Sequence, residues 1–88
     1  MDLDSKRRLL EQLAERLGIE VRYEAMGDRR GASAGGLCRL RDHAVILVDA
    51  GAPVAEQVGA LLDALCQLDT EEVFVPPAIR QDLDRRRR

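Results

Sequence analysis

The leucines near the start of the chain recur at the spacing of one helical face. Charged residues surround the apolar positions, which are Leu3, Leu9, Leu10, Leu13 and Leu17. This period is typical of an amphipathic helix. Asp2, Asp4 or Ser5 can accept hydrogen bonds from the free amides at the helix start, and Gly18 suits the left-handed position that ends a helix. We therefore predict a first helix over about residues 4–17.

The pattern then changes to that of strands. Ile19–Ala25 alternates apolar and charged residues, which predicts a strand with one face on a core and one in water. Met26–Gly36 is rich in Gly, Ala and Ser and is expected to be a flexible connector. Ala44–Val48 is continuously apolar, as in a strand that is buried on both faces or central in a sheet. Asp42–His43 can form a tight turn before it, although without the glycine that such turns favour.

A second strand is predicted over about Gly36–Arg41, forming a hairpin with the apolar strand that follows. Alternation places Cys38 and Leu40 on one face and Arg39 and Arg41 on the other. If helices cover the face of Cys38 and Leu40, the two arginines form an exposed basic stripe on the other face. We therefore expect Arg39 and Arg41 to contact a partner.

Helical spacing returns in Pro53–Leu68, where Pro53 occupies the first position, which tolerates proline best. Its apolar stripe consists of Val54, Val58, Leu61, Leu62, Leu65 and Leu68. Val73–Val75 is predicted to be a short extended segment. A last helix is predicted from Pro77 to about Arg85.

These elements predict an α+β fold in the order α-β-β-β-α-α. Residues 1–84 are expected to form a single small domain, with a three-stranded antiparallel sheet covered on one face by helices. Residues 85–88 are expected to be an arginine-rich C-terminal tail.

Composition limits the function classes. The chain has 88 residues, of which 45% are hydrophobic and 34% charged, which is typical of a globular domain. Aromatic residues make up only 2%, so the core must be aliphatic and thin, and self-association could stabilise it. The net charge of −2 argues against general nucleic-acid binding. The sequence contains no apolar run long enough for a membrane span and no secretory signal, and the preference for arginine over lysine suggests a GC-rich bacterial genome. We expect a cytoplasmic protein with two free thiols.

No pattern in the sequence predicts catalysis, a metal site or a cofactor. The candidate ligands Cys38, His43 and Cys66 lack the spacing of a zinc site, and a Cys–His nucleophile pair has no third orienting group. The segment Gly27–Gly36 lacks the Lys-Ser/Thr of a phosphate-binding loop. Glu71 and Glu72, adjacent in sequence, are expected to lie on a solvated corner. The sequence therefore predicts a protein that is not an enzyme.

The four arginines at the C-terminus are the remaining charge feature. They could attract phosphates or an acidic surface, but no aromatic residues alternate with them to stack bases. A frayed, solvated tail is the expected state. Arg85 and Arg86 nevertheless join Arg39 and Arg41 as candidate partner-binding residues.

Several segments resemble a family of small bacterial proteins with no assigned activity, over roughly residues 5–84. The segments that carry this resemblance are Gly36-Leu37-Cys38-Arg39-Leu40, Val45-Ile46-Leu47-Val48-Asp49 and Pro76-Pro77-Ala78-Ile79-Arg80. The resemblance implies an organisation and no mechanism.

The hairpin and the helix after it also resemble the local plan of ImmA/IrrE-type metallopeptidases. In that family the helix carries a His-Glu-x-x-His zinc motif. Asp63-Ala64-Leu65-Cys66-Gln67 stands at that place here, without either histidine or the glutamate. This resemblance implies a degenerate, inactive relative.

The sequence thus leads to three function hypotheses. The first is a non-enzymatic cytoplasmic interaction or adaptor module that binds a protein partner or a second copy, as a homodimer. Its leucine-rich first helix could bury its apolar stripe against that copy. The second is a nucleic-acid-binding accessory protein that uses the arginine tail with Arg39 and Arg41. The third is the inactive metallopeptidase-like domain.

Overall fold

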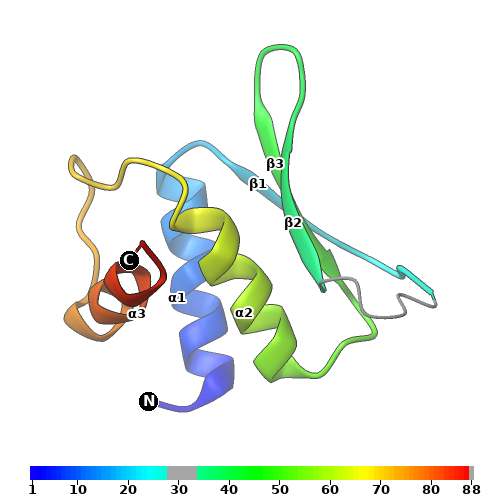
Figure 1. Ribbon diagram of the computed structural model, residues 1–88, viewed down its shortest axis with the longest axis horizontal. Helices are drawn as coiled ribbons and strands as arrows, with labels where there is room; N and C mark the ends of the chain where they lie inside the picture. The colour runs from blue at the N-terminus through cyan, green and yellow to red at the C-terminus, as the bar shows by residue number, and fades with distance from the viewer. Residues whose placement is uncertain (28–33, 88) are drawn as a thin grey trace.

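Three helices and three strands follow one another in the computed structural model, which describes residues 1–27 and 34–87. The elements are α1 (Leu3–Arg16), β1 (Glu20–Glu24), β2 (Gly35–Arg39), β3 (Ala44–Asp49), α2 (Val54–Leu65) and α3 (Pro77–Arg87) (Figure 1). The expected α+β class is confirmed. The connector predicted at Met26–Gly36 falls largely on residues 28–33, which lie outside the described residues.

The sheet is mixed, so the prediction of an antiparallel sheet is wrong. The strand order is β1-β3-β2, in which β3 pairs with β1 in parallel and with β2 antiparallel. After the β2–β3 hairpin, the chain returns through the middle of the sheet, so β3 lies between β2 and β1. Ala44, Val45, Ile46 and Val48 of β3 are all buried, which explains why this strand takes the central position.

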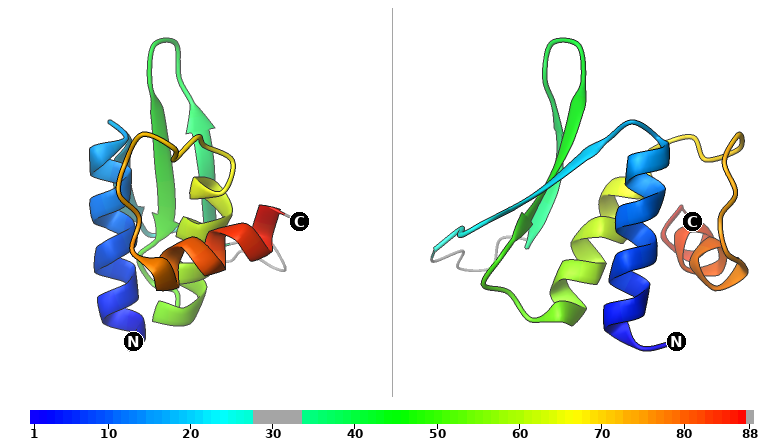
Figure 2. Two further views of the ribbon diagram at one scale, coloured as in Figure 1. Left: turned by 90° about the vertical axis from the view of Figure 1, so that its left-hand side faces the viewer. Right: turned by 180° about the vertical axis from the view of Figure 1, so that it is seen from behind.

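Helices α1 and α2 pack on one face of the sheet, and α3 packs on those two helices on the side away from the strands (Figures 1 and 2). Leu10 of α1, Ile46 of β3 and Leu61 of α2 are all fully buried in the shared core. Because leucines of α1 are buried within one chain, this helix does not offer its stripe to a second copy. The prediction that the leucine stripe of the first helix is free for a second copy is therefore wrong, and the homodimer itself stays a prediction.

Local contacts fix the ends of α1. The Asp2 side chain accepts a hydrogen bond from the Ser5 backbone amide at 2.8 Å. This bond holds the pKa of Asp2 below its ordinary value, because it favours the ionised carboxylate. Gly18 follows the helix with a φ of 76°, the left-handed conformation that glycine adopts without strain.

Helix α3 continues through Arg87, where the sequence predicts a frayed tail from residue 85. The Arg87 guanidinium donates to the carbonyl oxygens of Cys66 at 3.0 Å and Leu68 at 2.9 Å, and to Thr70 Oγ1 at 3.3 Å. These carbonyls lie just beyond the last residue of α2, so the Arg87 side chain ties the segment that follows α2 to α3. Arg85–Arg87 thus belong to the folded body, and Arg88 lies outside the described residues.

Candidate functional site

The β2–β3 hairpin extends beyond the helices (Figure 1), and residues 39–43 at its end are all exposed. Arg39 and Ala44 form the last residue pair of the ladder, and the Leu40 amide donates to the His43 carbonyl at 2.8 Å. We call residues 39–43 the hairpin tip. It is the candidate functional site because a backbone hydrogen bond fixes its base and its residues are exposed.

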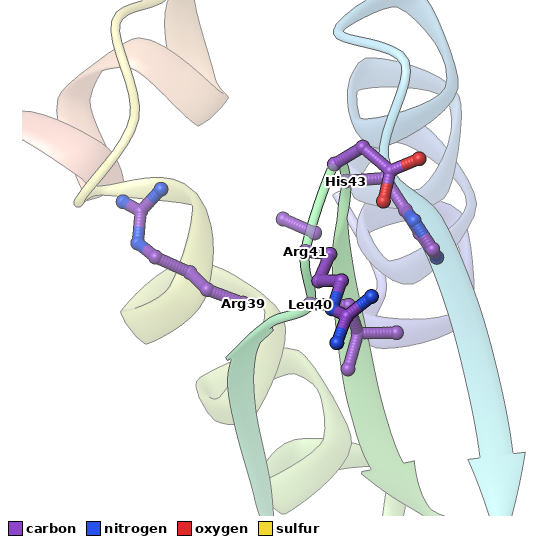
Figure 3. A pocket seen from close by; sticks show the side chains of 6 residues that line it. Arg39, Leu40, Arg41 and His43 are labelled. Carbon is purple, nitrogen blue, oxygen red and sulfur yellow. The ribbon is translucent and has the colours of Figure 1, made fainter.

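The two arginines of the hairpin lie on opposite sides, so the expected basic stripe is not formed. Leu37 pairs with the buried Ile46 and packs against the core, whereas the next residue, Cys38, is exposed. Arg39 therefore shares the helix-facing side with Leu37. Figure 3 shows the Arg39 side chain reaching towards α2 and the Arg41 side chain pointing the other way.

A shallow hollow of about 430 Å³ opens at the hairpin tip. Its lining consists of Arg39, Leu40, Arg41, Asp42, His43 and Ala44 (Figure 3). The Leu40 side chain, which the sequence assigns to the core face, is 48% exposed. Arg39 and Arg41 form no ion pair or side-chain hydrogen bond in the part of the chain that the structure describes. The hairpin tip therefore combines one exposed apolar side chain with two guanidinium groups that form no ion pair with any described residue, and it also carries the exposed carboxylate of Asp42.

The first residues of β1 add an ion pair near this hairpin. Arg22 Nε lies 2.7 Å from Glu20 Oε2, and this bond holds the pKa of Glu20 below its ordinary value. A positive charge on His43 acts in the same direction, more weakly. Glu20 already has a cationic partner, so it does not neutralise Arg39 or Arg41.

Arg85 and Arg86, the other two candidate partner-binding residues, lie on α3 and are not brought to the hairpin tip. Arg85 pairs with Asp82 at 2.9 Å, and Arg86 pairs with Asp63 of α2. Arg85 and Arg86 thus satisfy carboxylates of the same chain. The structure does not assemble the four arginines into one basic surface.

The side chains considered for metal binding or nucleophilic chemistry form no such site among residues 1–27 and 34–87. No group of three His, Cys, Asp or Glu side chains in these ranges could hold a metal ion. Cys66 is half-buried and donates through its thiol to the Asp63 carbonyl at 3.2 Å. Gln67, at the place of the zinc motif's second histidine, also donates to that carbonyl, at 3.0 Å. The polar groups around Asp63 therefore bond to one another and to Arg86.

Comparison with known proteins adds no family. No family model matches the chain, and no curated protein or solved structure is significantly similar to it. Both resemblances noted in the sequence remain predictions. No described helix is long and apolar enough to cross a membrane.

Two further side chains are exposed although the sequence does not mark them as candidate site residues. Phe74, in the connection between α2 and α3, is 69% exposed, and Tyr23 of β1 is 37% exposed. They are the only aromatic residues of the chain. The sequence gives little indication that Phe74 is exposed, because it stands between two valines and this pattern is equally typical of a buried strand.

Proposed function

We propose that this chain is a non-enzymatic interaction module of the cytoplasm that docks a protein partner through the hairpin tip. The observation that carries the proposal is the exposed Leu40 between Arg39 and Arg41, held on a projecting hairpin. An exposed apolar side chain surrounded by polar groups is the usual anatomy of a small docking surface. The guanidinium groups, which form no ion pair with any described residue, indicate an acidic partner surface.

The same observations argue against nucleic acid as the partner. Arg85 and Arg86 are engaged by carboxylates, and Arg39 and Arg41 point to opposite sides of the hairpin. A nucleic-acid backbone needs several cations along one line, with stacking aromatics beside them for single strands. The hairpin tip offers neither arrangement.

Affinity capture tests the proposal. The tagged chain would be used in extracts of its host as wild type, as the double variant Leu40→Ser/Arg41→Glu, and as the control variant Arg8→Glu. Arg8 is an exposed arginine of α1 without an ion pair in the described chain. Every sample is divided and half is treated with nuclease.

The proposal predicts proteins, including untagged copies of the chain itself, that bind wild type and the control but not the tip variant. Capture must survive nuclease treatment. Equal capture by all three forms would refute a role for the hairpin tip. Capture that disappears with nuclease would replace the protein partner with nucleic acid.

A further inference from the structure

The connection between α2 and α3 carries the opposite charge to the hairpin tip. Asp69, Glu71, Glu72 and Phe74 are all exposed there. We call these four residues the acidic turn. Glu71 and Glu72, like the two arginines of the hairpin tip, form no ion pair in the described ranges.

The acidic turn is held in a fixed shape from beneath. Thr70, within the turn, is only 1% exposed, and its hydroxyl accepts hydrogen bonds from Arg80 at 3.1 Å and from Arg87. Asp69 Oδ1 accepts from the Glu71 amide at 2.9 Å. A surface fixed before binding loses less conformational entropy when a partner docks.

The turn is also anchored to α1. Arg16 donates to the Phe74 carbonyl at 3.3 Å, and the Phe74 ring lies outside the core, 69% exposed. The acidic turn therefore places three exposed carboxylates beside one exposed aromatic ring, whereas the hairpin tip places two arginines, one carboxylate and a histidine beside the exposed Leu40.

We propose that the hairpin tip of one copy docks on the acidic turn of a second copy, with Arg41 facing Glu71 and Glu72, and Leu40 against Phe74. Within one chain these two surfaces lie on different sides of the molecule (Figures 1 and 2). The inference rests on the proposed docking function and identifies the acidic partner surface as part of the same protein.

The contact joins two different surfaces. It gives a closed dimer only if the hairpin tip of each copy binds the acidic turn of the other. It involves few residues, and exposed ion pairs contribute little each, so we expect a weak complex that forms only at high protein concentration. Raising the ionic strength weakens it, because the attraction is between solvent-exposed charges.

Charge reversal in both surfaces provides the test, using the purified chain and sedimentation velocity over a concentration series. Arg41→Glu places like charges in the contact, and so does Glu72→Arg. Each variant alone should have a Kd at least about tenfold higher than wild type. An equimolar mixture of the two variants pairs opposite charges again, and its association should return towards the wild-type level.

The matched control reverses two charges outside the contact. Arg8→Glu and Glu15→Arg both change exposed residues of α1 that form no ion pair in the described chain. These variants should associate as wild type does, alone and mixed. Circular dichroism of each variant confirms that it is folded.

A wild type that stays monomeric at the highest attainable concentration overturns the inference. So does a mixture of Arg41→Glu and Glu72→Arg that associates no better than either variant alone. The proposed docking function is refuted by a different result, namely that the tip variant captures the same proteins as wild type in the affinity experiment. Loss of capture by the tip variant with a monomeric wild type would mean that the acidic partner is another protein.

Discussion

Replacing Arg87 with alanine is expected to destabilise the fold. The guanidinium donates three hydrogen bonds, to the carbonyls of Cys66 and Leu68 and to the hydroxyl of Thr70. A hydrogen bond from a charged donor contributes about 1.5–3 kcal/mol when it is shielded from water. The Arg87 side chain is 30% exposed and Thr70 keeps its bond from Arg80, so water and Arg80 replace part of the loss. The net cost should be about 1–2 kcal/mol.

Urea unfolding followed by circular dichroism measures this cost. With a slope of about 1 kcal/mol per molar urea for a chain of this size, the midpoint should fall by about 1–2 M. Arg85→Ala is the matched control. Arg85 lies in the same last turn of α3 and is 67% exposed. Among the described residues it pairs only with Asp82, which Lys6 also contacts at 2.7 Å. Its loss should cost at most a few tenths of a kcal/mol.

The comparison of the two variants isolates the hydrogen bonds of Arg87. Both substitutions remove one positive charge near the C-terminal end of the same helix, so their effects on the helix dipole are nearly equal. Equal midpoints for Arg87→Ala and Arg85→Ala would refute the reasoning. They would mean that the C-terminal arginines contribute to stability only as a solvated tail.

Two further predictions concern β2 and β1. A Cβ on Gly35 would lie 1.9 Å from the Leu47 carbonyl oxygen, so Gly35→Ala should cost more than about 2 kcal/mol in urea unfolding. At Gly36 a Cβ meets nothing within 4 Å, and an equal loss in Gly36→Ala would contradict this explanation. Partial burial and the hydrogen bond to the Glu11 carboxylate raise the pKa of Tyr23 well above its ordinary value. The unfolded chain ionises first, so stability should fall as the pH rises above about 10, and this fall should be smaller in Tyr23→Phe. The phenolate absorbance of this only tyrosine checks the shift, and ionisation at an ordinary pKa would disprove it.

The helices could be predicted from the sequence because their apolar period is long and their ends are marked. Asp2 and Gly18 bound α1, and Pro77 begins α3 as expected. The end of α3 was missed because Arg87 is held by carbonyls of a distant segment. A run of arginines carries no local sign of such partners.

The sheet was predicted less well, for two physical reasons. Pairing between β1 and β3 is made over a long separation in sequence, and periodicity does not determine whether such a pair is parallel. In β2, apolar residues stand at both parities, with Leu37 on one and Cys38 and Leu40 on the other. If the wrong set is taken as the core-facing one, every side chain of the strand is assigned to the opposite face. This is why Arg39 and Leu40 were predicted on the wrong sides.

The central place of β3 in the sheet also affects how the protein folds. Its contacts with β2 join residues that are close in sequence, so the hairpin can form by closing a short loop. Its contacts with β1 need a much longer closure, and they link the N-terminal helix and strand to the rest of the chain. Folding should therefore be slower than in helical proteins of this length, because the parallel pair must form across that separation. A substitution that weakens only the β1–β3 pairing would slow this step without changing the hairpin.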